Sequence, residues 1–558
     1  MKHVYFIPAL LSALAFTACS DNDTLDTNLP EAEYGSPSEW YYAGGKLGTT
    51  NIQSAYAYRQ ATAAVDEAGL SLNFQIGESL FEKDYNTSTD AFAGLGPVYV
   101  RRGCLYCHPN YGHGKRQNAY RADQDGNGYL LVVYDKKTNA YIYSVAGMPQ
   151  TKAVKPFKPQ IDESKIVITW KDYTDEWGNK FPDGESYSLI YPEVTIPADA
   201  YYSPVTVKRD GKMVVIPSDQ VASEIGVRLE STIGIYGTGL TDAIPDDSIT
   251  AEWKRQSAYF NSVGKTNALN PAYWDQNTNE WVSYYVNNAG DKKKYVRRYT
   301  YAMSRGPILD AAGANAIWNI TNVTRPDRPK LYTTNAWAAA MAEDKEVIEK
   351  IKNDPTSPFW ASTDDEISKR VNGLLKPGTN QFSNEWHNFE PEMSADHFYE
   401  FMVWHRGLAI PRARNLNDAR VQQGKKVFME IGCANCHRPS WKTGSDNYWT
   451  PNMIAGKKLP RYANQTIYPY SDMMQHKLYM ANDIHGSWCR TTPLWGRGLA
   501  AVNGSGVERL HDCRARNEIE AIMWHAYSKN SHAYNAALKF YNLSKADRDA
   551  VVMFLRSI

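Results

Sequence analysis

The period of the hydrophobic pattern changes along the chain and divides it into segments. Between residues 128 and 235, apolar and polar positions alternate in short β-branched runs that proline and Gly-Asn turns separate. The clearest runs are Tyr129–Tyr134, Lys165–Trp170 and Val205–Val207. Alternation with a period of two is typical of strands that bury one face. The pattern therefore predicts short β-strands in this middle segment.

Helical patterns occur on both sides of this segment. Their apolar residues recur every three to four positions, which predicts helices with one buried face. The stretches are Ala55–Glu67, Ala336–Asn353, Ala395–Arg406, Arg516–His525 and Lys545–Ile558. Ser394 and Ser544 stand where helix N-caps are expected for two of them. The predicted fold class is mainly α, with a β-containing insertion.

The N-terminus has the pattern of a processing signal. A short apolar stretch, Val4–Phe16, is followed by Thr17-Ala18-Cys19. The stretch is too short to span a bilayer, and small residues before a cysteine resemble a bacterial lipoprotein signal. We therefore interpret residues 1–18 as a signal peptide, Cys19 as the lipidated residue, and 19–55 as a polar tether. An ordinary secretory peptide is the alternative.

This signal predicts where the protein resides. Elsewhere in the sequence no apolar run approaches the length of a membrane span, so contact with the membrane would be through the lipid anchor only. Ser20-Asp21-Asn22-Asp23 resembles the acidic surface-export tag of Bacteroidetes lipoproteins. We expect a cell-envelope protein on the outer membrane, exposed at the cell surface if this tag is functional.

One pentapeptide pattern occurs twice. Cys104–His108 and Cys433–His437 are both C-x-x-C-H, the attachment pattern of c-type haem. With 7 Cys and 12 His in 558 residues, chance gives about 0.002 such matches. The two thiols form thioethers with the haem, and the following histidine binds the iron. A redox C-x-x-C or half of a zinc site is the alternative. The predicted attachment sites are Cys104, Cys107, Cys433 and Cys436, with His108 and His437 as proximal ligands.

Charge narrows the range of partners. Lys plus Arg and Asp plus Glu both number 61, so the net charge is near zero. Neither nucleic acid nor a polybasic membrane surface is therefore indicated.

One segment resembles half of a calcium-binding loop. Asp123–Gly128 has alternating oxygen ligands before a glycine, but the later carboxylates of such loops are missing. A hairpin turn fits the segment better, and a calcium site is the alternative.

The surroundings of the two motifs also repeat. Gly77–Phe81 and Gly424–Phe428 share the pattern Gly-x-x-aliphatic-Phe ahead of a C-x-x-C-H. Such an internal duplication predicts two cytochrome c-like haem domains in tandem. Their predicted ranges are 56–127 and 394–558, with a mixed β/α insertion over 128–393.

The mature chain resembles the di-haem oxidoreductase family, which is related to bacterial di-haem cytochrome c peroxidases. The matching segments are Gly407–Arg414, Gly432–Pro439, Gln465–Asp472, Thr491–Gly496, His511–Ala515, Trp524-His525 and Phe554–Ser557, with Gly237–Pro245 and, less closely, Gly94–His108. The resemblance implies two haems, with peroxide reacting at the first and an electron relay at the second. It also implies a small peroxide-like substrate and an electron donor or acceptor protein.

The resemblance suggests a second ligand for one iron. In the peroxidases a Met fourteen residues after the histidine of a His-Asp-Gly motif binds the second haem, and that count runs here from His511 to His525. We therefore expect His525 to bind that iron, with His476 as the alternative. Replacing the thioether by an imidazole lowers the haem potential, which makes peroxidase activity less certain than the fold. The sixth ligand of the first haem and the catalytic residues are not identified.

The same segments contain two unusual cysteines. Cys513 stands where the family has glycine, and Cys489 directly precedes Arg490. Both segments should lie near the second haem, and the envelope is oxidising, so a disulfide is predicted between them. A free pair, or sulfur ligation to iron, is the alternative. Arg490 and Arg514 become candidates to pair with haem propionates.

Three functions follow from these observations. The leading hypothesis is a di-haem c-type oxidoreductase that couples electron transfer to peroxide reduction, or a related oxidation, at the first haem. The second is an envelope electron-transfer protein without a substrate. The third is an accessory lipoprotein for iron or haem acquisition that uses its aromatic-rich insertion.

Overall fold

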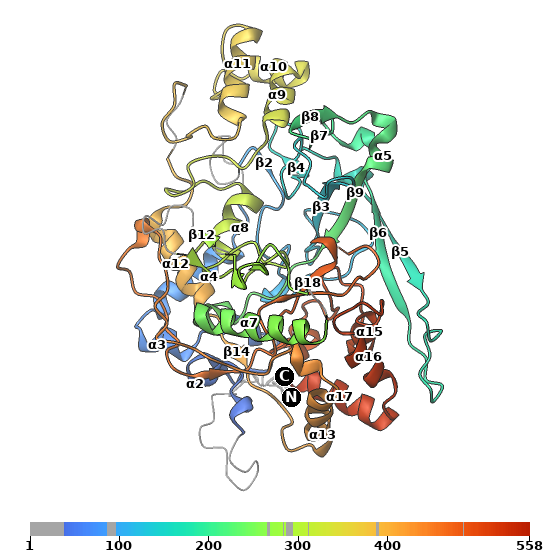
Figure 1. Ribbon diagram of the computed structural model, residues 1–558. Helices are drawn as coiled ribbons and strands as arrows, with labels where there is room; N and C mark the ends of the chain where they lie inside the picture. Colours follow the sequence, from blue (N-terminus) through green and yellow to red (C-terminus); the bar gives the residue numbers. More distant parts are fainter. Residues whose placement is uncertain are drawn as a thin grey trace, which may run out of the picture.

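The protein combines many helices with small, two-stranded sheets (Figure 1). The computed structural model describes residues 38–85, 96–264, 268–282, 284–285, 294–310, 312–386, 390–483 and 485–558. The predicted signal peptide and Cys19 lie outside these ranges. Within them, no helix has the length and apolar character that crossing a bilayer requires.

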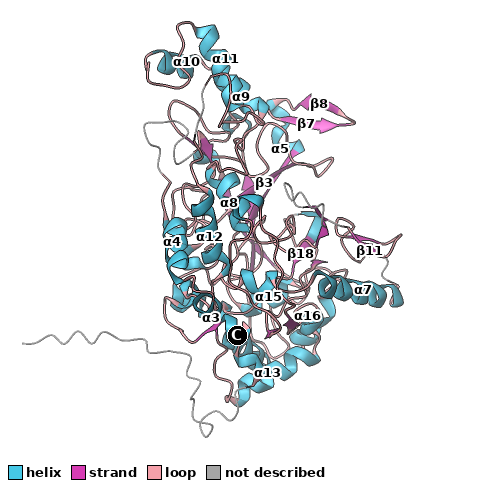
Figure 2. Ribbon diagram, turned by 90° about the vertical axis from the view of Figure 1, so that its left-hand side faces the viewer, coloured by secondary structure: helices cyan, strands magenta, loops and turns pink. Residues whose placement is uncertain are grey.

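A first pair of helices brings together distant parts of the sequence. α4 (Ser71–Glu82) packs along α12 (Ala395–Arg406), and the two lie side by side in both ribbon views (Figures 1 and 2). A Cβ added at Gly77 would lie 2.1 Å from a carbonyl oxygen of α12, so only glycine permits this approach. Phe81 then stacks on Trp404 with 4.3 Å between ring centroids.

A second pair repeats this arrangement. α13 (Ala419–Glu430) packs on α17 (Lys545–Ser557). A Cβ at Gly424 would lie 1.9 Å from a carbonyl oxygen of α17, and the rings of Phe428 and Phe554 are 5.3 Å apart. The Gly and Phe repeat predicted from the sequence therefore corresponds to two equivalent helix pairs.

The first helix pair joins two of the ranges predicted as separate domains. α12 falls inside the predicted range 394–558, yet its partner α4 belongs to the range 56–127. The unit around the first motif therefore takes its last helix from the far side of the insertion. Sequence proximity had placed α12 with the second motif, although its apolar face fits the glycine of α4.

The longest β-strands lie in the insertion, as predicted, and pair there as antiparallel ribbons. β3 (Leu130–Asp135) pairs with β9 (Ile225–Glu230), and their alternating side chains contribute to one apolar core. A long ribbon, formed by β5 (Val167–Tyr173) and β6 (Leu189–Thr195), projects along one side of the molecule (Figure 1). A shorter ribbon is formed by β7 (Thr206–Arg209) and β8 (Lys212–Val215).

Three helices form a separate cluster at one end of the molecule (Figure 1). They are α9 (Asn335–Glu343), α10 (Lys345–Lys352) and α11 (Asp364–Leu375). The single helix predicted over 336–353 is thus divided at Asp344, whose carboxylate caps α10 by accepting from two backbone N–H groups. Because these capping bonds stabilise a helix N-terminus, they favour a new helix start at this point over one continuous helix.

The other helix predictions agree with the structure to different extents. Over 55–67 only α3 (Ala63–Glu67) is α-helical. Ser394 and Ser544 accept backbone N–H bonds at the starts of α12 and α17, which confirms both as N-caps. Elements around the second motif are α7 (Asp246–Ser262), α15 (Glu518–Trp524), α16 (Tyr534–Tyr541), β17 (Gln475–Lys477) and β18 (Trp488–Arg490).

Candidate functional site

The two C-x-x-C-H motifs adopt the same tight turn. The backbone N–H of His108 donates to the carbonyl of Cys104, and that of His437 donates to the carbonyl of Cys433, both at 2.9 Å. None of the four motif cysteines is in a disulfide. Each turn therefore presents two thiols and a histidine together, as covalent attachment of a haem requires.

The second motif lines a partly open cavity of about 630 Å³. Cys433, Cys436 and His437 line it, together with Phe428 from α13. Pockets of about 300–1,000 Å³ commonly hold cofactors. The lining and the size both suit a haem.

Two histidines of this cavity are held in matching ways. Nδ1 of His437 donates to the Tyr470 carbonyl at 3.0 Å. Nδ1 of His525, at the end of α15, donates to the Ala521 carbonyl at 2.6 Å. Burial lowers the pKa of His437, to about 4, and that of His525, so both imidazoles are neutral. A neutral ring fixed through Nδ1 offers Nε2 to a metal. The pair therefore has the chemistry of two axial ligands.

His476 lines the same cavity but is engaged elsewhere. Its Nε2 lies 2.7 Å from Asp472 Oδ2, and its Nδ1 lies 3.5 Å from Nδ1 of His532. Neither ring nitrogen is directed away from these partners. The arrangement favours His525 over His476 as the second ligand.

The first motif is surrounded by aromatic side chains of the α4–α12 pair. The ring of His108 lies 6.5 Å from that of Phe81, and burial lowers the pKa of His108 to about 4. Its Nδ1 is buried without a hydrogen-bond partner of good geometry among the described residues. This imidazole is therefore neutral, like His437, but is not fixed in the same way.

A histidine that the sequence did not single out lies near the first motif. His405 of α12 is 2% exposed, and neither of its ring nitrogens has a hydrogen-bond partner within the described ranges. Burial, and then the neighbouring His108, lowers the pKa of His405 to about 3. The sequence would have indicated His405 only if α12 had been assigned to the first motif. His405 directly follows Trp404, which contacts Phe81 of α4.

The geometry of the second site agrees with a comparison of the sequence with known families. Residues 376–558 match a family described as "Di-haem oxidoreductase, putative peroxidase". Over this region the chain is similar to that family. A search of curated proteins gave no significant match. The family implies haem cofactors and a redox function. The matched region contains the second motif, Cys433–His437.

The two arginines predicted to lie near the second haem differ in their partners. Arg490 is buried and lines the cavity, and its Nε and Nη1 have no hydrogen-bond partner within the part of the chain that the structure describes. Arg514 is buried too, but its Nε and Nη2 bind the carboxylate of Asp512 at 2.7–3.0 Å. A propionate would satisfy Arg490 more readily than Arg514.

The predicted disulfide between Cys489 and Cys513 is not formed. The thiol of Cys489 lies 3.9 Å from His511 Nδ1, whereas that of Cys513 faces the Gly114 carbonyl at 3.6 Å. A disulfide needs its sulfurs about 2.05 Å apart. The two segments direct their thiols toward different neighbours, so the structure does not support this pairing.

The calcium alternative finds no cluster of ligands. Asp123–Gly128 forms turns, and the Asp123 carboxylate pairs with Lys152 Nζ at 2.9 Å. Among the described residues, neither group of side chains with metal-binding geometry includes this segment.

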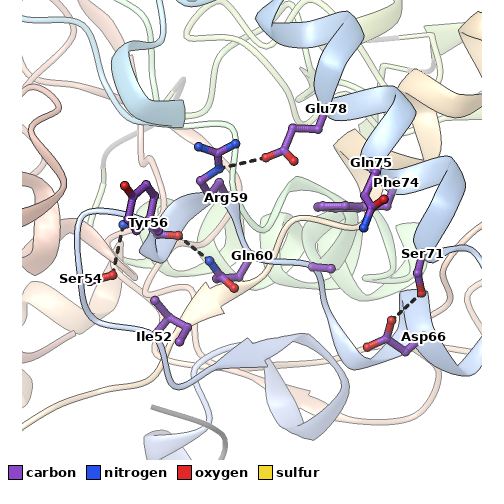
Figure 3. Close-up of a pocket in the computed structure, with 11 residues that line it drawn as sticks. Ile52, Ser54, Tyr56, Arg59, Gln60, Asp66, Ser71, Phe74, Gln75 and Glu78 are labelled. Carbon is purple, nitrogen blue, oxygen red and sulfur yellow. Dashed lines mark hydrogen bonds and ion pairs between the residues drawn. The ribbon is translucent and has the colours of Figure 1, made fainter. Parts of the chain in front are cut away.

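A surface cleft of about 520 Å³ lies on the outer side of α4 (Figure 3). Figure 3 shows Arg59 directed at Glu78, which it binds at 3.0 Å. The Tyr111 hydroxyl contacts Glu78 and Glu82 from within. The cleft contains neither motif, so it is not a haem site.

Proposed function

We propose that this chain is a di-haem c-type cytochrome that transfers electrons and reduces a peroxide-like substrate at the first haem. The family match supports a redox function. The observation that carries the finer proposal is how the histidines are held. His437 and His525 are fixed by backbone carbonyls, whereas neither nitrogen of His405 has a hydrogen-bond partner among the described residues.

The second site is suited to electron relay. Cys433 and Cys436 would hold the haem covalently, with His437 and His525 as its axial ligands. When bound, the haem supplies a one-electron redox centre, and two imidazole ligands give it a lower potential than a His/Met pair. Arg490 would offset the charge of a propionate.

The first site is suited to proton transfer at a substrate. Cys104 and Cys107 would hold the haem, and His108 would bind its iron. Reduction of a peroxide needs a group that accepts a proton from one oxygen and returns it to the other. His405 is neutral, so one ring nitrogen can accept a proton while the other can donate one. We assign this role to His405.

Spectra at stepped potentials test the proposal. UV-visible and EPR spectra of the purified, haem-loaded protein would be recorded with and without hydrogen peroxide. We expect one haem to stay low-spin throughout and the other to respond to peroxide in at least one redox state. Two low-spin haems that ignore peroxide in every redox state would exclude the peroxidase function.

A second function is favoured by the same histidine. If His405 itself binds the first iron, both haems have two imidazole ligands and the chain is an electron-transfer protein. The spectra of His405→Leu decide between the two. A change from low-spin to high-spin at one haem supports ligation, whereas an unchanged spectrum with slower peroxide reduction supports proton transfer.

We also propose that the protein is anchored to the outer membrane through a lipid on Cys19. The sequence Thr17-Ala18-Cys19 after a short apolar stretch supports this location. Incorporation of a labelled fatty acid, abolished in Cys19→Ala, is the expected result. Labelling that persists in the variant would contradict it.

A further inference from the structure

Three side chains with different metal-binding atoms meet beside the second cavity. The carboxylate of Asp483, the thiol of Cys489 and the imidazole of His511 place their ligand atoms within 4.8 Å of one another. Cys489 belongs to β18, and His511 lies in the loop before α15. Cys489 and His511 also line the cavity, so the cluster is open to a further ligand from that side.

Among the described residues, no counter-charge is in direct contact with the carboxylate of Asp483. Both of its oxygens are buried, and neither has a hydrogen-bond partner in the described part of the chain. Nearby arginines are engaged elsewhere, because Arg228 donates from Nε to the main-chain carbonyl of Asp483 and Arg514 binds Asp512. Burial raises the pKa of the Asp483 carboxyl to about 7. A buried carboxylate of this kind is stabilised by a cation.

The orientation of His511 matches that of a metal ligand. Its Nδ1 lies 3.9 Å from the Cys489 sulfur, and its Nε2 lies 3.5 Å from Asp512 Oδ2. Asp512 is in turn fixed by Arg514 at 2.7 Å. Histidines that bind metals commonly direct their other nitrogen to a carboxylate, which fixes the ring and raises its basicity.

The three donors indicate the kind of metal. A thiolate, an imidazole and a carboxylate together suit a borderline divalent ion, whereas calcium and magnesium prefer oxygen alone. Three protein ligands with one side open are typical of zinc sites that keep an exchangeable fourth position. We propose that Asp483, Cys489 and His511 bind one Zn²⁺ ion beside the second haem cavity, with Asp512 positioning His511.

The test is a metal count and a zinc-edge X-ray absorption spectrum. The full, haem-loaded protein would be equilibrated with Zn²⁺ and freed of loose metal by gel filtration. We expect one zinc for every two irons, with a sulfur neighbour at about 2.3 Å and nitrogen or oxygen neighbours at about 2.0–2.1 Å. Iron does not interfere at the zinc edge, and the count does not depend on peroxide chemistry.

Matched variants complete the experiment. Cys489→Ser should lose the bound zinc, whereas Cys513→Ser, which changes the neighbouring cysteine outside the cluster, should keep it. Asp512→Asn should weaken zinc binding by about 10–100-fold, because it alters only the support of His511. Unchanged Soret bands show that each variant is folded. The proposal fails if no zinc survives gel filtration, if Cys489→Ser binds it as well as the parent, or if peptide mapping finds a Cys489–Cys513 disulfide.

Discussion

The two C-x-x-C-H turns occupy equivalent helix pairs, but their histidines are held differently. Around the second turn, the Nδ1 atoms of His437 and His525 are both tied to backbone carbonyls. Around the first, neither Nδ1 of His108 nor either nitrogen of His405 has such a bond among the described residues. A duplicated fold can thus support different chemistry, because the hydrogen bonds of an imidazole decide whether it is a fixed ligand or can exchange protons.

The two units also differ in continuity. α13 and α17 lie in one stretch of the C-terminal region, whereas α4 and α12 are separated by the whole insertion. Closing the first unit therefore requires contacts between residues far apart in the sequence, which slows folding. The aromatic contact of Phe81 with Trp404 stabilises the closed unit once it has formed.

The largest effect is expected from giving the second haem a thioether ligand. His525→Met should raise the potential of one haem by a substantial part of the roughly 0.8 V range that axial ligands span. The other haem should be unaffected, because the first site contains no part of α15. Spectroelectrochemical titration measures both potentials. His532→Met, in the same cavity, is the control and should shift neither. An unshifted potential in His525→Met would show that another residue binds this iron.

The next effect concerns the first site. His405→Leu removes both unpaired nitrogens and keeps an apolar side chain of similar size. Peroxide reduction should slow by about 10²–10⁴-fold, the usual contribution of a proton-transfer group. Stopped-flow absorbance gives the rate. His397→Leu changes an exposed histidine of the same helix and should leave it unaltered. Equal rates in both variants would remove His405 from the mechanism.

The local features were accessible from the sequence. The two motifs, the Gly and Phe positions and the N-caps Ser394 and Ser544 depend on neighbours within a few residues. Periodicity also located the strands β3, β5 and β7 to within a few residues. Each of these signals is short-range, so no knowledge of the tertiary fold was needed.

The long-range features were not accessible in this way. The pairing of Gly77 with α12 depends on surfaces that meet only after the insertion has folded, and so the position of His405 near the first motif was not predicted. The direction of the Cys489 and Cys513 thiols likewise depends on how β18 and the His511 loop pack. The family resemblance led us to expect both segments near one site, but it does not indicate which atoms face each other.

A smaller effect tests whether the helix pairs are equivalent. Gly77→Val and Gly424→Val each insert a side chain where a Cβ already meets backbone, so each should destabilise its own unit by about 1–3 kcal/mol. Denaturant titration followed at the haem bands would show one haem losing its axial histidine coordination early in each variant, and a different one in the two. Leu72→Ala and Lys426→Ala, which change exposed residues of the same helices, serve as controls. Early loss of coordination at the same haem in both variants would contradict two separate units.

The smallest effect separates the rival ligands of the second haem. His476→Gln keeps an N–H donor for Asp472, which also accepts from Gln256 at 2.9 Å, so stability should fall by only about 1 kcal/mol, the scale of one hydrogen bond. The low-spin EPR signal of that haem should persist, because His525 is already oriented by the Ala521 carbonyl. A high-spin signal in this variant would instead make His476 the ligand. His525 would then be a buried histidine satisfied by its own helix, and the matching Nδ1 bonds of His437 and His525 would have no bearing on the iron.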